Sequence, residues 1–482
     1  MNYEPIIGLE VHARLLTKSK LFSSDVNNFG GEPNTHISPV TLAHPGTLPF
    51  LNGKAIRQAV MLGLACESSI APFLYFERKN YFYPDLPKGF QISQLKTPIC
   101  SGGFVEIESD SGIRKIQLNR IHIEEDAGKS IHDIDKLDSL IDLNRAGTPL
   151  LEIVTEPVLF SAEEAFQFMA ELRKLVRWLG ICDGNMEEGS MRCDANISMR
   201  KKGESKLGTK VEVKNLNSFR FLRKAIEMEI KRQADELESG GRITRHTRSF
   251  DAEKGVTFAM RHKEEEDDYR YFPEPDLPPV VVTDDMLKEA RENMPELPGI
   301  LRKRFVVQYH LQPNEAAILS EEKEMAAYFE RLANKTGDPR TAANWMLGTV
   351  KNYLNKQAVS MEEFPVSAER LADLLTMVKN GMVSHSVAAL KIFPEMAQNQ
   401  SESPDAIAQR LNLVQQSDVT LVTHYIEGAL AQHPDKVKSY RNGKKGLLGF
   451  FMGEIMKQSK GRLNPEVAGK LLMEALNKKY EA

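Results

Sequence analysis

Cysteine is scarce in this sequence: the chain has four cysteines among 482 residues, and no two of them form a C-x-x-C pair. Widely spaced single cysteines argue against a disulfide scaffold and against a cysteine-rich zinc site. The sequence also lacks an apolar run of about 18 residues and an N-terminal secretory signal. We therefore expect a reduced, cytoplasmic protein that does not cross a membrane.

The common phosphate-binding loops are missing as well. There is no G-x-x-x-x-G-K-[ST] sequence and no strand-linked G-x-G-x-x-G. If ATP binds, it binds on a sheet surface through a metal ion, arginine and lysine, outside the P-loop class. The net charge of −4 excludes an overall basic coat. Residues 436–482, however, contain eleven lysines and arginines against four glutamates, so an acidic body carries a basic C-terminal segment.

The composition is that of an ordinary globular protein, with 41% hydrophobic and 27% charged residues. A chain of this length predicts about three domains. Strand and helix patterns alternate until a proline-rich stretch at 273–298, and helical periodicity dominates after it. A polar stretch at 398–404 is typical of a linker. We predict an α+β body at 1–294, an all-α domain at 295–400 and a small, basic, all-α tail at 405–482.

Two helices of the body are indicated by their caps. Ser161 and Glu164 form a capping-box sequence, and apolar residues then recur at helical spacing until Gly180. Ser218 can cap a second helix, whose apolar stripe ends before Gly240. Both stripes are typical of core contacts, so we assign no chemistry to these two helices.

Several strand-like segments carry acidic side chains. Alternating or short apolar runs predict strands at 6–15, 121–126, 150–156, 191–200 and 210–214. Acids, Asn or His lie on the polar face of these strands or beside it. A half-buried antiparallel sheet shows the same alternation without any function, because one of its faces simply meets water. The polar residues of interest are Glu10, His12, Glu124, Glu125, Glu152, Asp194 and Glu212.

Two interpretations of these strands stay open. Each polar face taken singly is most simply a solvated surface. If the strands are neighbours, however, several carboxylates meet in one cavity, where repulsion raises their pKa values unless a divalent cation compensates. Oxygen ligands suit Mg²⁺, the partner of ATP phosphates, better than Zn²⁺. His12 is an uncommon Mg²⁺ ligand, and it can equally orient a carboxylate or be a hydrogen-bonded strand histidine.

Basic and aromatic residues stand close to the same segments. Lys79, Arg192 and Lys214 can clamp phosphates and stabilise charge in a transition state, or simply pair with surface acids. The segment 78–85 contains three aromatic residues, which are either core residues or a stacking platform for a base or the 3′ end of an RNA. In the tail, lysines around a predicted helix start favour an RNA backbone, or they form a solvated helix face.

Longer motifs occur in a fixed order along the chain, at 7–12, 78–85, 122–129, 142–145, 147–152, 186–196 and 212–218. With them, the sequence closely resembles the B-subunit (GatB) family of the aspartyl/glutamyl-tRNA amidotransferases. The resemblance covers essentially the whole chain, including 269–276 and the basic tail. Motifs of this length and order are much more specific than a single glycine pattern.

The resemblance implies a cradle domain related to glutamine synthetase, with an antiparallel sheet, then a helical domain and a YqeY-like tail that binds tRNA. It also implies a reaction in which ATP, with Mg²⁺, phosphorylates the side-chain carboxylate of Glu on tRNA(Gln) or Asp on tRNA(Asn). Ammonia then displaces the phosphate. An amidase (A) subunit releases this ammonia from glutamine and delivers it through an internal channel, and a small C subunit completes the heterotrimer.

Transferred position by position, the resemblance assigns the metal and nucleotide cavity to Glu10, His12, Glu125, Glu152, Asp194 and Glu212. Glu124 is the alternative to Glu125, because strand phase does not decide which of the two faces inward. The expected catalytic residues are Glu125 and Glu152, with phosphate contacts from Lys79, Arg192 and Lys214. Many family members carry a four-cysteine zinc knuckle near the N-terminus. Here those places read Ser23-Ser24-Asp25 and Ser38-Pro39-Val40-Thr41, so we expect no zinc.

Two other functions remain as alternatives. A non-catalytic tRNA-binding scaffold of the same complex would also carry the basic tail, although the acid-lined strands favour a catalytic subunit. A stand-alone ammonia ligase that acts on a free amino acid would not need such a tail. No Ser-Lys amidase pattern is present, so we expect glutamine hydrolysis to belong to the partner. Whether Glu-tRNA, Asp-tRNA or both are used depends on the accompanying synthetases.

Overall fold

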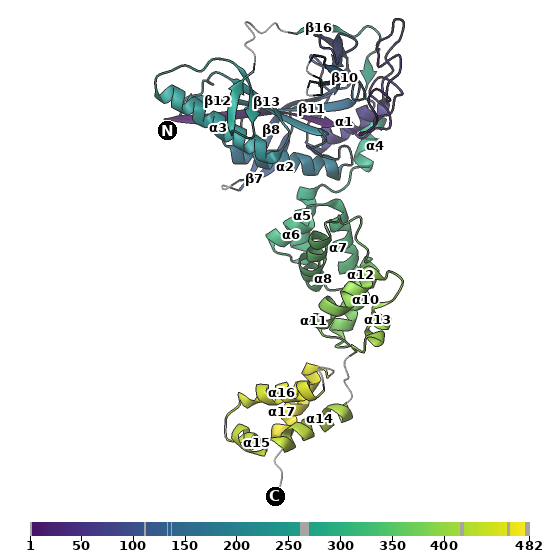
Figure 1. Cartoon of the computed structure of the whole chain (residues 1–482), viewed down its shortest axis with the longest axis vertical. Helices are drawn as coiled ribbons and strands as arrows, with labels where there is room; N and C mark the ends of the chain where they lie inside the picture. The colour runs from purple at the N-terminus through teal and green to yellow at the C-terminus, as the bar shows by residue number, and fades with distance from the viewer. Residues whose placement is uncertain are drawn as a thin grey trace. The chain divides into compact units, whose positions relative to one another are not determined.

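The computed structural model of the chain describes residues 2–109, 112–132, 134–135, 137–260, 269–414, 419–459 and 463–477. The chain falls into two compact units, Met1–Pro298 and Gly299–Ala482. The first unit combines a large sheet with helices, and the named elements of the second are helices (Figure 1). The predicted α+β class is therefore confirmed. Within the described ranges, none of the helices has the length and apolar character that crossing a bilayer requires.

A ten-stranded sheet organises the first unit, with β1 (Tyr3–Arg14) inside it. β1 pairs with β11 (Pro149–Thr155) on one side and with β12 (Met191–Lys201) on the other, so segments far apart in the sequence lie side by side. The other strands of this sheet are β2 (Ser69–Ile70), β6 (Cys100–Ser101), β7 (Phe104–Ser109), β8 (Gly112–Glu125), β13 (Val211–Leu216), β14 (Thr247–Asp251) and β15 (Val256–Ala259).

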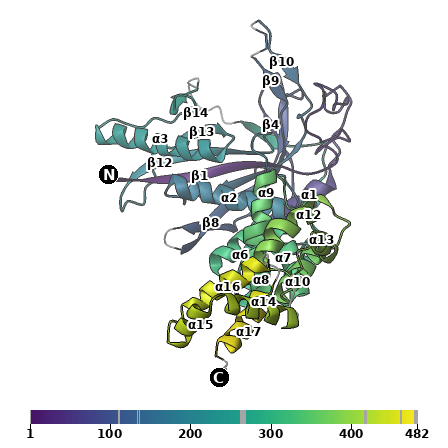
Figure 2. The ribbon, with the colours of Figure 1, turned by 60° about the horizontal axis from the view of Figure 1, so that its bottom comes forward.

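The strand order is β15-β14-β13-β12-β1-β11-β8-β6-β2, and β7 pairs with β8. The sequence predicts an antiparallel sheet, and β13, β12, β1, β11 and β8 pair in this way. β13 and β14 are an exception, because they run parallel. Parallel neighbours need a long crossover. Helix α3 (Phe219–Glu238) lies in that connection and runs beside β12 and β13 (Figure 2).

The remaining elements of the first unit are short. A three-stranded sheet has the order β16 (Arg270–Pro273), β4 (Glu77–Asn80) and β5 (Phe90–Ser93). The β9–β10 hairpin projects from the unit (Figure 2). The bounds of the others are β3 (Phe73–Leu74), β9 (Lys129–Ile131), β10 (Leu140–Asp142), β17 (Val280–Val281), α1 (Gly53–Ala65), α2 (Ala162–Trp178) and α4 (Asp284–Glu292).

Helices α2 and α3 begin at the predicted caps. The Ser161 hydroxyl accepts a hydrogen bond from the backbone N–H of Glu164 at 3.1 Å, and that of Ser218 accepts one from Phe221 at 3.1 Å. The Glu164 carboxylate does not complete the capping box on Ser161 itself. It accepts a hydrogen bond from the backbone N–H of Phe160, one residue earlier, at 2.7 Å.

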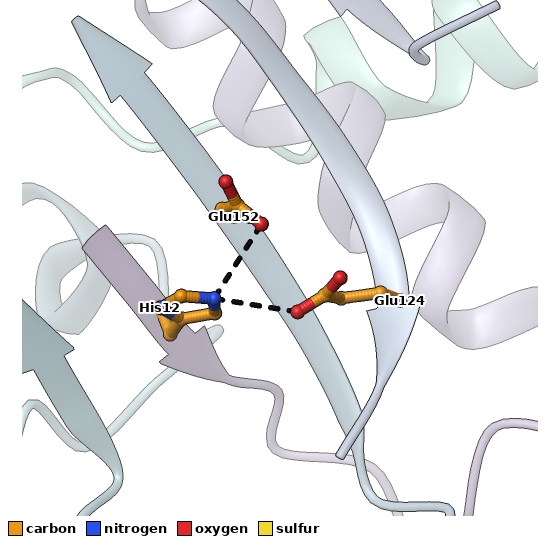
Figure 3. A group of neighbouring side chains, drawn as sticks. All are labelled: His12, Glu124 and Glu152. Carbon is orange, nitrogen blue, oxygen red and sulfur yellow. Dashed lines mark ion pairs between the residues drawn. The ribbon is translucent and has the colours of Figure 1, made fainter. Parts of the chain in front are cut away.

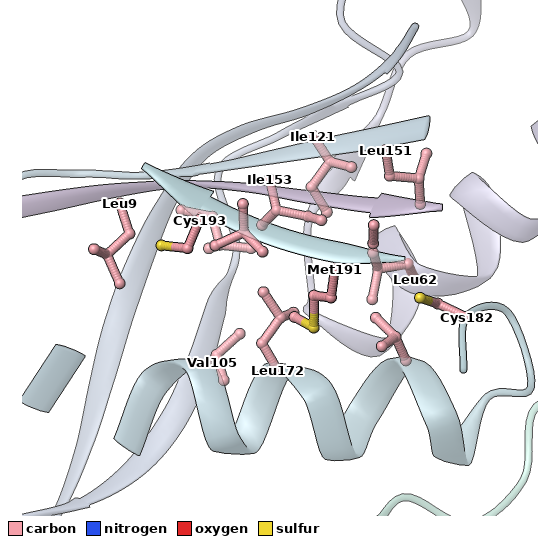
Figure 4. Packing of buried hydrophobic residues seen from close by; sticks show 14 of the residues in the cluster. Leu9, Leu62, Val105, Ile121, Leu151, Ile153, Leu172, Cys182, Met191 and Cys193 are labelled. Carbon is pink, nitrogen blue, oxygen red and sulfur yellow. The ribbon is translucent and has the colours of Figure 1, made fainter. Parts of the chain in front are cut away.

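One face of the large sheet is apolar and buried. Leu9, Val11 and Ala13 of β1 have no exposed surface, and Leu172 of α2 packs with Met191 in the layer between helix and sheet (Figure 4). Because side chains alternate along a strand, the polar residues between these apolar ones point to the opposite face. The core beneath α2 therefore determines which face of the sheet displays the acids.

The second unit is built from helices, including π-helical turns at Met346–Val350 and Ala388–Ile392. Helices α14–α17 share an apolar core of their own. The proposed division of this unit near 400–405 stays a prediction, and residues 460–462 and 478–482 of the basic segment lie outside the described residues. The α-helices are α5 (Pro298–Tyr309), α6 (Pro313–Leu319), α7 (Lys323–Thr336), α8 (Pro339–Trp345), α9 (Lys351–Gln357), α10 (Ala368–Lys379), α11 (His385–Val387), α12 (Phe393–Gln398), α13 (Pro404–Arg410), α14 (Val419–Gln432), α15 (Pro434–Arg441), α16 (Leu447–Gln458) and α17 (Pro465–Asn477).

Candidate metal and nucleotide site

The register of three central strands places a row of polar side chains on the face of the sheet opposite its apolar core. His12 of β1 lies opposite Glu152 of β11, and Glu152 lies opposite His122 of β8. Glu124 follows His122 by two residues and therefore shares its face. We call His12, His122, Glu124 and Glu152 the His12 group.

The two carboxylates of the His12 group lie between its two imidazole rings. Nε2 of His12 is 3.3 Å from Oε1 of Glu124 and 3.5 Å from Oε2 of Glu152 (Figure 3). Nε2 of His122 is 3.1 Å from Oε2 of Glu152 and 3.6 Å from Oε2 of Glu124. The side chains of Glu124 and His122 are each 5% exposed, so these interactions are poorly screened by water.

The rings and carboxylates perturb one another's pKa values. Burial disfavours the charged form of His12, but hydrogen bonds to Glu124 and Glu152 outweigh it and raise the pKa of His12 to about 10. His122 is likewise opposed by burial, and the charge of Glu152 with hydrogen bonds to both acids raises its pKa to about 9. Burial would raise the pKa of each carboxyl group, yet the two histidines hold both well below the ordinary value. Two imidazolium rings thus balance two carboxylates.

Three members of the His12 group can also hold a cation. One ligand atom each from His12, Glu124 and Glu152 lies within 4.8 Å of the others. Carboxylate oxygens fit Mg²⁺, and imidazole fits it less well, so the donor set fits a hard cation with water in its remaining positions. A cation at this place has to displace the proton of His12, because only the neutral ring is a ligand.

A second set of acids lies beside the first, on β1, β12 and β13. Glu10 is opposite Asp194, and Asn196 is opposite Glu212. Nζ of Lys214 is 2.9 Å from Oε1 of Glu212 and 3.5 Å from Oδ2 of Asp194. We call Glu10, Asp194, Glu212 and Lys214 the Glu212 group.

The Glu212 group carries more acid than base. Burial raises the pKa of Glu10, and the negative charges of Glu152 and Glu212 raise it further. The amide of Asn196 partly opposes this by donating a 2.8 Å hydrogen bond to Oε1 of Glu10. The pKa of Lys214 is raised against burial by Asp194 and Glu212, so its ammonium stays charged. An added cation would relieve the repulsion on Glu10.

The position of Asp194 depends on a local irregularity of β13. The register of β12 against β13 shifts between Cys193 and Ala195. Asn215, near the end of β13, has φ +60°, a left-handed conformation that asparagine tolerates better than most residues. Its backbone N–H donates a 2.9 Å hydrogen bond to Oδ1 of Asp194. Backbone geometry and Lys214 together hold both oxygens of this carboxylate.

Glu124, the sequence alternative, is the acid that lies against His12. Glu125 is the last residue of β8, and its Oε1 accepts hydrogen bonds from Nζ of Lys88 and, at 2.8 Å, from the backbone N–H of Ile92. Lys88 and Glu125 also line a small pocket that includes Phe22. Of the six expected metal and nucleotide residues, the structure thus places His12 and Glu152 in the His12 group. Glu10, Asp194 and Glu212 lie in the Glu212 group, whereas Glu125 has other partners.

The expected phosphate contacts take different positions around this face. Lys214 lies within the Glu212 group. Arg192 is opposite His12 in the register, and its NH2 is 3.0 Å from Oδ2 of Asp126. Lys79 of β4 lies 4.8 Å from the ring centre of Tyr269. Burial opposes its charge, but attraction chiefly to Glu124 raises the pKa of Lys79. Lys214 and Arg192 thus pair directly with carboxylates, whereas Lys79 is attracted to the acids of the His12 group.

The sequence reasoning did not assign His122 and Asn196. Both could have been found from the sequence, because His122 is two residues from Glu124 and Asn196 is two residues from Asp194. Residues two apart on a strand share a face. Each has a buried polar atom without a hydrogen-bond partner among the described residues, Nδ1 in His122 and Oδ1 in Asn196. Unpaired buried polar atoms are costly, so they identify a place where an ion, water or substrate group would be stabilised.

The two segments considered for a zinc knuckle, 23–25 and 38–41, do meet, but around a carboxylate. Oδ2 of Asp25 accepts hydrogen bonds from the hydroxyls of Ser38 at 2.9 Å and Ser23 at 3.0 Å, and also from Thr41. One carboxylate and three hydroxyls are not the sulfur and nitrogen ligands typical of structural zinc. The expected absence of zinc stays a prediction, and the hydrogen bonds of Asp25 cross-link this loop.

Comparisons with known proteins agree along the whole chain. A family model described as the GatB/GatE catalytic domain matches residues 5–288, and one described as the GatB domain matches 327–476. The catalytic-domain model thus matches the first unit, which contains the sheet with the acidic side chains. Fold and site define a protein of two units, of which the first carries the candidate site.

Individual relatives match this chain over nearly its full length. A protein of Thermoanaerobacter pseudethanolicus is 46% identical over 478 residues, covering 99% of this chain and 100% of the relative. Proteins of Ectopseudomonas mendocina and Nitrosococcus oceani are each 48% identical, over 481 and 479 residues, with the same coverage. All three bear the name of the B subunit of aspartyl/glutamyl-tRNA(Asn/Gln) amidotransferase. The chain belongs to the GatB family.

Proposed function

We propose that this chain is the subunit of a tRNA-dependent amidotransferase that activates a side-chain carboxylate. The substrate is Glu on tRNA(Gln), Asp on tRNA(Asn), or both, and the products are Gln-tRNA(Gln) and Asn-tRNA(Asn). The names of the relatives support this class of substrate. The observation that carries the proposal is the convergence of His12, Glu124 and Glu152 on the polar face of the sheet.

Activation of the substrate carboxylate is the difficult step. A carboxylate is a poor acyl donor, so one of its oxygens first forms a bond to the γ-phosphorus of ATP, and the bond from that phosphorus to the β,γ-bridging oxygen breaks. Ammonia then attacks the carbonyl carbon of the acyl phosphate, inorganic phosphate leaves, and a proton is lost from nitrogen. The net reaction forms an amide at the expense of one ATP.

The residues of this chain serve the first step through charge. Mg²⁺, when bound, supplies positive charge that allows two anions, ATP and the carboxylate, to approach each other. His12, Glu124 and Glu152 would hold one such ion, and Glu10, Asp194 and Glu212 offer further oxygen ligands beside it. Lys79, Arg192 and Lys214 would bind phosphate oxygens. Glu125 stays a candidate catalytic residue, and its present partner is Lys88.

The other steps require partners. We infer that ammonia comes from an amidase (A) subunit that hydrolyses glutamine, and that a small C subunit completes a heterotrimer. The tail would bind tRNA. Its support is a set of cations in α15 and in the turn before α16, where Nζ of Lys436 lies 3.3 Å from the ring centre of Phe450 and Nζ of Lys445 lies 4.2 Å from that of Tyr440. Tyr440 is buried, so the cations themselves would serve the binding, by neutralising phosphates of a nucleic-acid backbone.

The decisive experiment traps the activated carboxylate. The complex, with Glu-tRNA(Gln) or Asp-tRNA(Asn), ATP and Mg²⁺, is supplied with hydroxylamine in place of glutamine, so that an acyl phosphate is converted to a hydroxamate. We expect formation that depends on ATP and Mg²⁺ and a large loss in Glu152→Gln. Glu156→Gln is the matched control, because Glu156 follows the same strand and its Oε1 is bound 2.7 Å from Asn119 Nδ2. Equal rates in all three proteins would favour a non-catalytic tRNA-binding scaffold.

A further inference from the structure

The carboxylate of Glu212 is held at both of its oxygens. Nζ of Lys214 is 2.9 Å from Oε1, and the hydroxyl of Thr247 donates a 3.1 Å hydrogen bond to Oε2. Lys214 is shared with Asp194, so it does not by itself determine how the Glu212 carboxylate is rotated. The hydroxyl of Thr247 supplies the second, dedicated contact that defines the plane of this group.

Thr247 comes from the crossover part of the sheet. It is the first residue of β14 and lies opposite Glu212 in the parallel pair of β13 and β14. The backbone N–H of Glu212 also donates to the carbonyl of His246, at 3.1 Å. A parallel pair with only three residues in register has few ladder hydrogen bonds, so β14 needs support from elsewhere to keep this alignment.

That support is a fully buried carboxylate on α3. Glu229 has no exposed surface, and it accepts hydrogen bonds from Arg232 at 2.6 Å and from the hydroxyl of Thr257, on β15, at 3.0 Å. Arg248, which directly follows Thr247, has its Nε 3.3 Å from Oε2 of Glu229. A buried carboxylate is stable only with such partners. Glu229 therefore fastens the β14–β15 hairpin to α3.

We propose that Thr247 is a positioning residue for the cation and phosphate site: its hydroxyl orients the carboxylate of Glu212, and the Glu229 contacts hold Thr247 in place. The inference rests on the proposed function, because it assumes that Glu212 faces a divalent cation. Partners that orient a metal-binding carboxylate typically contribute about 10–100-fold to metal affinity. Without the hydroxyl, Glu212 is free to turn toward Lys214, and its oxygen is lost to the cation.

The hairpin offers a matched pair of variants to test this. Thr247→Val and Thr257→Val each remove one hydroxyl at nearly constant shape from neighbouring strands. Only the first hydroxyl contacts Glu212, whereas the second contacts Glu229. Thr247→Ser keeps the hydroxyl and tests rescue. Glu212→Gln identifies the part of the cation binding that depends on this carboxylate.

Mn²⁺ binding to the assembled complex is measured by electron paramagnetic resonance, without ATP or tRNA, together with thermal unfolding. We expect Thr247→Val to raise the half-saturating Mn²⁺ concentration of the Glu212-dependent sites about tenfold, with little change in Tm. Thr247→Ser should restore binding to within about twofold of wild type. Thr257→Val should lower Tm, because it removes a donor from buried Glu229. It should weaken Mn²⁺ binding much less than Thr247→Val does, because Arg232 and Arg248 still hold Glu229 and the Thr247 hydroxyl is intact.

The inference is overturned if Thr247→Val binds Mn²⁺ like wild type, if Thr247→Ser fails to restore binding, or if Glu212→Gln leaves binding intact. It is also overturned if both valine variants weaken binding equally, because the hairpin would then act only through general stability. The binding measurement involves no catalysis. A failure of the hydroxamate experiment therefore refutes the proposed reaction without deciding the role of Thr247.

Discussion

The His12 group and the Glu212 group lie on the same face of one sheet, but different bases balance their acids. In the His12 group, two imidazole rings face two carboxylates, and each ring is protonated because of them. In the Glu212 group, three acids share the ammonium of Lys214, and Glu10 is left with a raised pKa. The first group is balanced without a cation, whereas the second has negative charge to spare.

This difference predicts how each group responds to a cation. Binding at the His12 group exchanges a proton for the ion, since imidazole is a ligand only when it is neutral. Binding at the Glu212 group relieves repulsion and requires no proton from Lys214. The affinity for a hard cation should therefore depend on pH at the His12 group and on the orientation of the carboxylates at the Glu212 group.

The largest effect is expected from Glu124→Gln. This change removes the charge between the two imidazole rings and one of three convergent ligands, so we expect the ATP-dependent hydroxamate rate to fall on the order of 100-fold. Glu212→Gln, in the other group, should reduce it less, because Glu10 and Asp194 remain. The two rates are measured side by side at saturating ATP. A larger loss in Glu212→Gln would reverse the ranking of the two groups.

The pH dependence of cation binding comes next. The pKa of His12 is about 10, so at neutral pH an ion must displace its proton, and affinity should rise with pH by up to about tenfold per unit. Mn²⁺ titrations between pH 6 and pH 8 measure this slope. In His12→Asn, the affinity of the remaining sites for Mn²⁺ should change much less with pH. If the affinity of the wild type changes equally little with pH, His12 is not a ligand.

The stability of the cation-free chain should also depend on these rings. Their pKa values lie above the ordinary value of 6.5, so the folded state binds the protons more tightly. Their contribution is complete below pH 6.5, provided that the acids are ionised, and it is lost as pH rises through about 9–10. Tm should fall by a few degrees more in wild type than in His12→Asn/His122→Asn over this range. Equal falls in Tm for the two proteins would contradict the positive charges assigned to His12 and His122.

The smallest effect on the site is expected from Asp25→Ala. The carboxylate of Asp25 lies outside both groups and accepts hydrogen bonds from three hydroxyls, so its loss leaves three donors without their acceptor and should destabilise the fold by about 1–2 kcal/mol. Chemical unfolding measures this loss. Mn²⁺ binding should stay within about twofold of wild type, because Asp25 belongs to neither group of proposed ligands. A strong loss of Mn²⁺ binding would show that this loop supports the cation site directly.

Particular residues show how far the sequence predicts the site. Alternation in β1 and β12 correctly places Glu10, His12 and Asp194 on the polar face, because their apolar neighbours mark the core side. The same argument does not decide between Glu124 and Glu125. Both are buried, and the choice depends on Lys88 and the backbone of Ile92, which meet Glu125 only in the folded chain.

Helix α3 shows a second limit. Its apolar stripe predicts a plain core helix, and Leu222 and Ile226 are buried as expected. The same stripe also buries Glu229, which the hydrophobic pattern does not indicate. Arg232 is a local partner, three residues away, but Arg248 and Thr257 come from a hairpin whose position depends on the crossover. Only these distant donors make a buried carboxylate acceptable.

Motif order and side-chain periodicity are local properties of the chain, so they suffice to predict the family, the helix caps and the polar and apolar faces of the main strands. The folded chain is needed to show that His12, Glu152 and His122 form one row, that Glu124 lies against His12, and that Thr247 contacts Glu212. The physical reason is strand register. Pairing between segments far apart in the chain is selected by the packing of the whole core, and a shift of one residue would turn every acid to the other face.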